Sequence, residues 1–284
     1  MVNENELTQY NTNKNMKITD ANYLLRHIEA LQGFSTLGSG TTEPMLIRGV
    51  CTTTGEKADY VIKFVNSPRM SVEASSRELI ASFMAMELEL NVPEPAIINV
   101  TQPFVETLRG HQGYKAAANS IGKNFGCRYI EGFMELLWNQ KLSEGQLDQA
   151  RKIFAFDMLI LNTDRRTNKP NLLSDGEKII IFDHELAFGF VFDLITNNTP
   201  WIFSDADKHW IENHFFYSTL KSNKYQFEDF IQQFNQLNEN FWDKAIVLLP
   251  ENWRKDQVYF IRTRMTELLS HRQEFLDSLY KILD

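Results

Sequence analysis

Apolar residues in the first half of the chain come in short segments that predict β-strands. Segments at residues 34–37, 45–51 and 60–65 are rich in β-branched and aromatic residues and are joined by polar turns. Two hairpin connections between three strands predict an antiparallel meander. Residues 96–100 predict a further strand, and residues 127–130 predict an edge strand leading out of this part of the chain.

Elsewhere, apolar residues recur at helical spacing. One helix is predicted over residues 72–90, ahead of two prolines that end it. Another is predicted over residues 143–161 and opens with a capping box formed by Ser143 and Gln146. The rest of the chain predicts several amphipathic helices, the last of them over residues 257–283.

These elements predict an α+β fold, and 284 residues fit one large domain or two lobes that share a cleft, of which two lobes are favoured. The strand-rich N-lobe is expected over residues 16–131 and the mainly helical C-lobe over residues 132–284, with a short hinge near Glu131 and Gly132. Residues 1–15 are polar and rich in asparagine, which is typical of a mobile tail.

Composition narrows the class of protein. A net charge of -8 disfavours a general nucleic-acid binder, which needs a basic face. Cys51 and Cys127 are the two cysteines, too few for a disulfide framework, which favours a reducing compartment. No apolar run approaches the about 20 residues of a membrane span, and the chain does not start like a secretory signal. We therefore expect a soluble, cytoplasmic protein.

Candidate chemistry lies in a polar loop at residues 162–171 and in the acid that ends the apolar run 179–182. An Asp in a loop, an Asn just downstream and an Asp after the next hairpin are the parts of a phosphoryl-transfer centre. Asp164 would accept the proton of the acceptor hydroxyl, and Asp183 would bind magnesium through hard carboxylate oxygens. Taken alone, each segment could equally well be a plain hairpin with a hydrophilic loop.

A second set of candidates lies upstream. Lys63 interrupts an apolar strand, where an unpaired ammonium would be costly, so it must reach solvent or pair with an acid. Glu78 is the favoured partner, because it lies about two turns into the predicted helix; Glu73 and Glu87 lie nearer its ends. Lys63 would then bind nucleotide phosphates, whereas a solvent-facing lysine is the alternative.

Other motifs carry less information. Gly38, Ser39 and Gly40 lie between the first two strands, where backbone amides could approach phosphate oxygens, although most such turns are only turns. The chain contains no P-loop motif, and its histidines and cysteines form no zinc set. His184 is expected to be structural, or to steer the carboxylate of Asp183.

Together, Lys63, Glu78, Asn-Thr-Asp-Arg and Ile-Phe-Asp-His-Glu resemble the HipA-like kinases of the protein-kinase and phosphatidylinositol-kinase-like superfamily, over residues 34–188. The resemblance implies a bilobal protein-kinase-like fold and the use of ATP with Mg2+. It implies that Lys63 binds phosphate and pairs with Glu78, that Asp164 is the catalytic Asp and that Asp183 holds the metal.

The metal-binding Asn is the point at which this chain departs from the resemblance. Relatives place it five residues after the Asp, where this chain has Lys169. Asn168 lies one residue earlier and Asn171 two residues later; Asn171 is favoured because it directly precedes two leucines.

The leading hypothesis is an ATP-dependent kinase that acts on a Ser/Thr hydroxyl of a protein. Known HipA proteins are larger and act as toxins beside a DNA-binding antitoxin, so an antitoxin-like partner is part of what the resemblance implies. A small-molecule or lipid kinase is one alternative, although the acidic charge argues against a membrane face. A non-catalytic partner-binding module with a kinase fold is another, but a scaffold would not need the complete set of Lys63, Glu78, Asp164 and Asp183.

Overall fold

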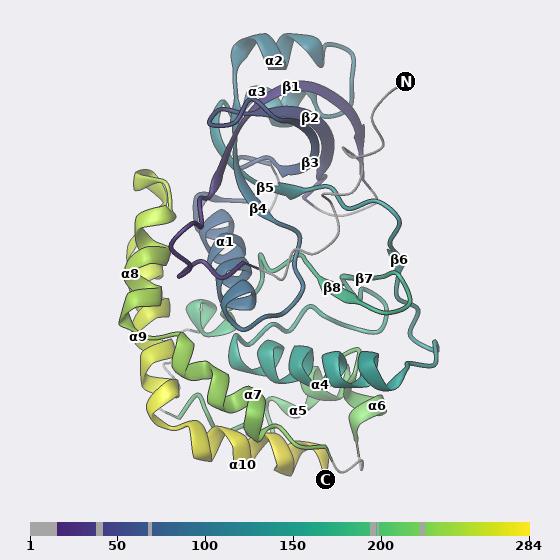
Figure 1. The fold of residues 1–284 in the computed structure, drawn as a ribbon, viewed down its shortest axis with the longest axis vertical. Coiled ribbons are helices and arrows are strands. Elements are labelled where there is room, and N and C mark those ends of the chain that lie inside the picture. Colours follow the sequence, from purple (N-terminus) through teal and green to yellow (C-terminus); the bar gives the residue numbers. More distant parts are fainter. Residues whose placement is uncertain (1–15, 38–41, 68–69, 194–196, 198, 222–224) are drawn as a thin grey trace.

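In a computed structural model, the longer strands gather at one end of the molecule and most helices at the other (Figure 1). The structure describes residues 16–37, 42–67, 70–193, 197, 199–221 and 225–284. The mixed α+β architecture, with its strands early and its helices late in the chain, confirms the predicted fold class at this level.

The strand-rich end is a closed five-stranded barrel. Around the barrel the order is β1 (Arg26–Thr36), β2 (Met45–Cys51), β3 (Lys57–Lys63), β5 (Gly122–Arg128) and β4 (Pro95–Val100). The antiparallel pairing of β1, β2 and β3 confirms the predicted meander. Closure comes from a parallel pairing in which Arg26–Glu29 of β1 run beside Ala96–Asn99 of β4.

Two strand predictions were wrong in detail. The first strand begins at Arg26 rather than at residue 34, because its early residues pair with β4. Of the edge strand expected at residues 127–130, only residues 127–128 are in a strand; they end β5, which pairs on both sides, with β3 and with β4. Gly126 permits this close packing, since a Cβ atom there would lie 2.7 Å from the Val61 carbonyl oxygen.

The barrel interior is a core of its own, built from the inward side chains of its strands, among them Ile47, Tyr60 and Ile98. Two short helices pack against this core: α2 (Gln102–Thr107) and α3 (Tyr114–Ala118). They occupy the stretch between residues 101 and 124, whose sequence pattern predicts no particular element.

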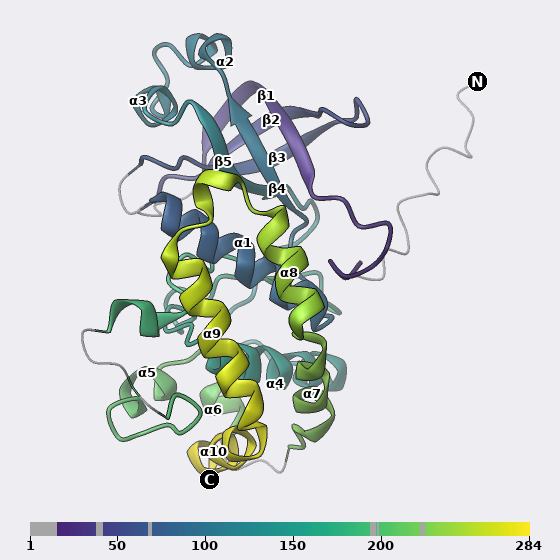
Figure 2. The ribbon, with the colours of Figure 1, turned by 90° about the vertical axis from the view of Figure 1, so that its left-hand side faces the viewer.

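Helix α1 (Val72–Glu87) lies between the barrel and the other helices (Figures 1 and 2). Ser71 caps it by accepting a hydrogen bond from the Ala74 amide, and it ends one turn earlier than predicted. Nearly all of α1 is buried, and Leu79 and Phe83 belong to the same core as the C-terminal helices. The helix that carries Glu78 is therefore fixed by the helical part of the molecule as well as by the barrel.

A three-stranded sheet and helix α4 follow the barrel. The sheet consists of β6 (Met134–Glu135), β7 (Leu172–Ser174) and β8 (Ile179–Ile181). Helix α4 (Glu144–Leu159) begins at the predicted capping box. The Gln146 backbone amide donates to the Ser143 side chain, and the Ser143 backbone amide donates to the Gln146 side chain. This helix delivers the chain into the loop that holds Asp164.

The remaining chain is helical. Its elements are η2 (Gly189–Phe192), α5 (Lys208–Glu212), α6 (Tyr217–Leu220), α7 (Glu228–Gln233), η3 (Phe234–Gln236), α8 (Glu239–Leu248), η4 (Glu251–Trp253), α9 (Asp256–Ser270) and α10 (Arg272–Leu283). The single helix predicted over residues 257–283 is wrong, because the chain turns at His271 (Figure 2). The turn lets α10 pack Phe275 against Phe203 and Phe234, and Trp201 stacks on the His271 ring.

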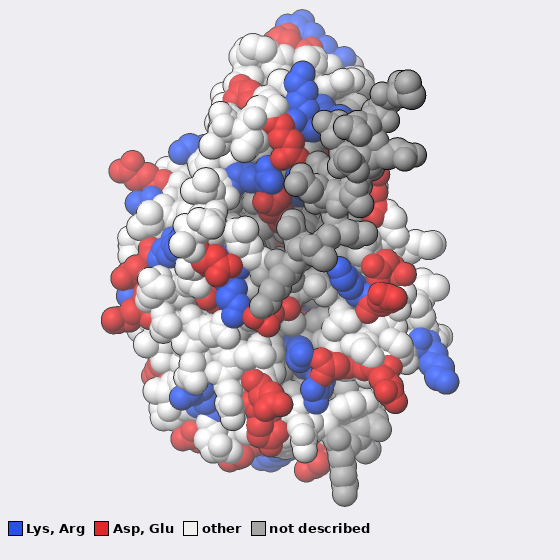
Figure 3. Space-filling view, in the orientation of Figure 1, with Lys and Arg blue, Asp and Glu red and all other residues white. Residues whose placement is uncertain are grey.

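Acidic and basic side chains are interspersed over the face drawn in Figure 3, on the barrel as well as on the helices. That face has no broad basic surface of the kind that nucleic-acid binding needs. Among the described residues, every helix is too short or too polar to pass through a lipid bilayer.

Candidate active site

Lys63, at the end of β3, lies at the centre of three carboxylates. Its ammonium donates hydrogen bonds to Asp183 Oδ1 at 2.5 Å, to Glu185 Oε2 at 3.0 Å and to Glu78 Oε2 at 3.1 Å. Only 9% of the Lys63 side chain is exposed. The structure therefore brings together residues from the barrel, from α1 and from the segment after β8, and Lys63 pairs with Glu78 rather than facing solvent.

The protonation of these groups follows from their burial and their mutual charges. Burial raises the pKa of Glu78 to about 7, against the opposing pull of Lys63. Burial also raises the pKa of Glu185, again against Lys63. For Asp183, burial is outweighed by the ammonium groups of Lys63 and Lys169, which hold its pKa well below the usual range. Asp183 is thus the carboxylate of this cluster that stays ionised most firmly.

Asp164 is linked to this cluster by a second lysine, Lys169. The ammonium of Lys169 donates to Asp164 Oδ2 at 2.6 Å and lies 3.2 Å from Asp183 Oδ2, so it bridges the two acids. The Arg166 guanidinium donates to Asp164 Oδ1 at 2.9 Å. Asp164 and Asp183 thus contact the same cation, although the sequence separates them by a hairpin.

The loop that carries Asp164 is held by a buried ionic framework. Arg165 donates through Nε to Asp157 Oδ2 at 2.5 Å, and both side chains are fully buried. Its Nη1 donates to the carbonyl oxygens of Pro170 and Asn171, at 3.2 and 2.7 Å. His214 donates to the same Asp157 oxygen at 3.0 Å. Helix α4, the loop and the segment after α5 are therefore joined through Asp157.

His184 does not steer Asp183, contrary to one sequence-based expectation. Its Nε2 lies 3.2 Å from Arg165 Nη2 and must accept, because a guanidinium can only donate. The proton then lies on Nδ1, which has no hydrogen-bond partner among the described residues. Burial and the nearby Arg165 lower the pKa of His184 to about 3, so the ring is neutral and structural.

The two candidate asparagines have different surroundings. Asn168 is exposed, in a tight turn where Arg166 and Lys169 exchange two backbone hydrogen bonds. Asn171 is buried, and its backbone carbonyl oxygen accepts a hydrogen bond from Arg165. Asn171 and Asp183 both adopt positive φ, at 50° and 63°, which is uncommon for residues other than glycine and is concentrated at functional sites.

Gly38, Ser39 and Gly40, the expected phosphate-binding turn, lie outside the described residues.

Sequence reasoning assigned no role to several residues of this site. Glu185 is two positions after Asp183, a spacing that could have suggested that both acids reach the same side. Asp157 interrupts an apolar helix face, which is itself a sign of a buried partner. Lys169 was noted only because it takes the place of an Asn, and no pattern in the sequence shows that it bridges two acids.

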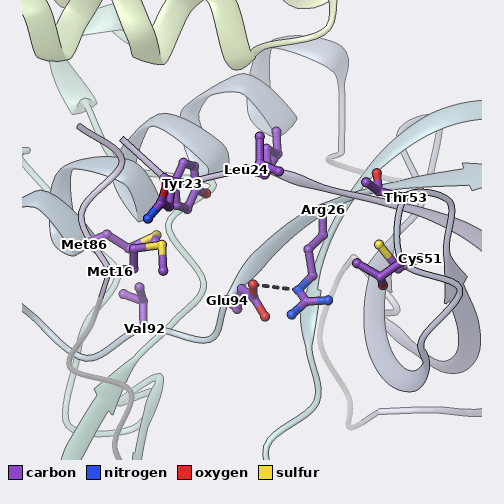
Figure 4. A pocket seen from close by; sticks show the side chains of 12 residues that line it. Met16, Tyr23, Leu24, Arg26, Cys51, Thr53, Met86, Val92 and Glu94 are labelled. Atoms are coloured by element: carbon purple, nitrogen blue, oxygen red, sulfur yellow. Dashed lines mark hydrogen bonds and ion pairs between the residues drawn. The ribbon is translucent and has the colours of Figure 1, made fainter. Parts of the chain in front are cut away.

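A separate cavity of about 320 Å³ lies beside the start of β1 (Figure 4). Its wall includes Tyr23, Met86 and Cys51, together with the ion pair between Arg26 and Glu94. None of the charged residues around Lys63 lines this cavity, so it is distinct from the candidate active site.

The candidate active site combines two lysine ammonium groups with several carboxylate groups. Glu78, Asp183 and Glu185 offer carboxylate oxygens within 4.8 Å of one another, and such hard oxygen ligands suit Mg2+. Lys63 and Lys169 bring positive charge to the same place, as the transfer of a phosphoryl group requires.

A comparison with known families agrees with this chemistry. No curated protein matches the chain. The model of a family described as HipA-like kinase matches residues 34–278, from the end of β1 into α10. That match spans most of the chain and includes the helices beyond residue 188, in which the sequence alone showed no familiar motif. The chain belongs to the HipA-like kinase family.

Proposed function

We propose that this chain is an ATP-dependent kinase that transfers the γ-phosphate to a Ser or Thr hydroxyl of a protein. The observation that carries the proposal is the contact of one buried ammonium, Lys63, with Glu78 and Asp183 at once. A lysine oriented by an acid from a neighbouring helix, next to a firmly ionised acid, is the arrangement that holds nucleotide phosphates in kinases.

Each residue then has a role. Lys63 binds the α- and β-phosphates, and Glu78 and Glu185 orient it. Asp183 and Asn171 hold Mg2+, which neutralises charge on the phosphates when bound; the exposed turn position of Asn168 makes it the less suitable ligand. Gly38, Ser39 and Gly40 are assigned to the phosphate lid on sequence alone.

Asp164 acts on the acceptor. It orients the incoming hydroxyl and accepts its proton, while the framework of Asp157 and Arg165 keeps the loop in place. Residues 16–131 and 132–284 serve as the two lobes of the kinase. The proposed location is the cytoplasm, supported by two cysteines that form no disulfide. A protein substrate and an antitoxin-like partner are proposed from the resemblance to HipA-like kinases alone.

The test is incubation of the purified chain with labelled ATP and Mg2+. Mass spectrometry would then follow phosphate on the chain, on proteins of a cell extract and on its lipids and metabolites. We expect phosphoserine or phosphothreonine that disappears with Asp164→Asn. Phosphate found only on lipids or metabolites would instead support a lipid or small-molecule kinase.

A binding measurement separates an inactive kinase from a scaffold. ATP with Mg2+ should raise the melting temperature, since a ligand that binds only the native state stabilises it, by about 2.7 kcal/mol at a hundred times its Kd. Lys63→Ala should reduce that shift. An unchanged melting curve at saturating ATP would contradict the kinase proposal and favour a partner-binding module.

A further inference from the structure

Lys169 differs from an ordinary surface lysine in what it touches. Its side chain is 36% exposed, but the two carboxylates that it contacts are only 6% and 15% exposed, for Asp164 and Asp183 respectively. The backbone of Lys169 is fixed as well, because its amide and carbonyl both bond to Arg166. The ammonium is therefore paired with two largely buried acids, although part of the side chain is exposed.

Neither acid depends on Lys169 alone for a counter-charge. Arg166 pairs with the other oxygen of Asp164, and Lys63 pairs with the other oxygen of Asp183. Lys169 takes the remaining oxygen of each. An ammonium has three donors, so two are used here and the third has no partner among the described residues.

The place of this ammonium is defined by the two acids. On the proposed function, Asp164 faces the acceptor hydroxyl and Asp183 lies at the phosphates, so the group between them lies where the phosphoryl group crosses. We propose that Lys169 is a further catalytic residue, which binds the γ-phosphate of ATP and stabilises it during transfer.

Lys169 assists the transfer of the γ-phosphoryl group from ATP to the acceptor hydroxyl. The bond between the γ-phosphorus and the bridging oxygen breaks, and its electron pair stays on ADP. A new bond forms between the γ-phosphorus and the acceptor oxygen, whose proton passes to Asp164. Lys169 stays protonated throughout and offsets the negative charge on the γ-phosphate oxygens.

The inference rests on the proposed function, and comparing ATP with ADP separates the two. Calorimetric titration with a non-hydrolysable ATP analogue and with ADP, both with Mg2+, is done on wild type, Lys169→Met and Lys169→Arg. The contact with the γ-phosphate predicts that Lys169→Met lowers the affinity for the ATP analogue about tenfold to a hundredfold and leaves the affinity for ADP unchanged. Lys169→Arg, which keeps the charge, should recover part of the loss.

Lys178→Met is the matched control. Lys178 is exposed in the turn between β7 and β8, so this variant loses the same charge on the next hairpin without touching either acid. It should bind both nucleotides as the wild type does. An equal loss of ATP and ADP affinity in Lys169→Met, or no loss, would overturn the role of Lys169. Failure of the wild type to bind either nucleotide would refute the proposed function itself.

Discussion

Asp164 and Asp183 share Lys169 but differ in every other partner. Asp183 also bonds to Lys63, whereas Asp164 also bonds to Arg166 of its own loop. The two carboxylates should therefore fail in different ways when each is changed to the neutral amide. One would lose proton transfer to the acceptor, and the other would lose the metal that nucleotide binding needs.

Asp164→Asn is expected to keep Mg2+-dependent ATP binding and to lower the rate of phosphoryl transfer at least about a hundredfold. Asp183→Asn is expected to lose both. Titration calorimetry and transfer of labelled phosphate measure the two properties, and Asp205→Asn, on an exposed segment, is the control. Full transfer activity in Asp164→Asn would show that the catalytic assignment is wrong.

His184 makes stability depend on pH. Its folded pKa of about 3 lies below its usual value of 6.5, so the unfolded chain binds more protons between these two values. Stability is then lost as the pH falls from 6.5 toward 3, by about 2 kcal/mol at a pH of about 5 for this group. Burial lowers the pKa of His214 as well, which adds a loss in the same direction.

The measurement is urea unfolding at a pH of about 7 and of about 5. His184→Gln keeps an acceptor for Arg165 but cannot titrate. The wild type should lose about 2 kcal/mol more than this variant over that interval. Equal losses in the two proteins would mean that His184 is not held neutral.

At the scale of elements, the loop after α4 is organised by one carboxylate. Asp157 accepts from Arg165, His214 and Asn162, which come from the loop and from the segment after α5. Removing its charge would leave the guanidinium of Arg165 buried without a counter-ion. The geometry of the Asp164 loop therefore depends on a residue that would touch no substrate.

Asp157→Asn is expected to destabilise the protein by about 3–5 kcal/mol and to lower transfer activity in whatever fraction stays folded. The control is Asp148→Asn on the same helix, where the ion pairs with Arg151 and Lys152 are partly exposed, and it should cost at most about 1 kcal/mol. Chemical unfolding measures both. Similar losses for the two variants would contradict the role of Asp157.

Local patterns predicted the parts of the site better than their assembly. The Ser143 cap, the Lys63–Glu78 pair and the acid after β8 follow from apolar spacing and from charges at positions that need partners. The barrel could not be predicted in this way, because the parallel pairing of β1 with β4 joins residues about 70 apart that share no turn. The break at His271 was missed because the helical spacing continues across it.

At the scale of the molecule, α1 ties the barrel to the C-terminal helices. Ser76 Oγ donates to the Trp253 carbonyl oxygen at 3.0 Å, and Gln257 donates to the Glu73 carbonyl oxygen at 3.2 Å. Arg77 donates to the Glu185 carbonyl oxygen at 2.7 Å. The last quarter of the chain thus supports the helix that carries Glu78, which gives those helices a part in the site.

This coupling predicts that the chain unfolds in one transition. Circular dichroism and tryptophan fluorescence should give the same unfolding midpoint, because α1 shares one hydrophobic core with α4 and α9. A fragment of residues 16–131 should not keep α1 folded, since the apolar face of α1 would lose its cover. Strong amide-exchange protection of α1 in that fragment would contradict this prediction.

The closed barrel also restricts how other chains can attach to this protein. An open sheet presents unpaired amide and carbonyl groups along its outer strands, and these groups can recruit a strand from another chain. Each of the five barrel strands has a neighbour on both sides, but β1 pairs with β4 only over Arg26–Glu29. This route is therefore blocked along most of the barrel, and the later residues of β1, which pair with β2 alone, are the exception. The short sheet formed by β6, β7 and β8 has free margins as well. Elsewhere on the barrel, a partner would have to recognise side chains rather than extend the backbone.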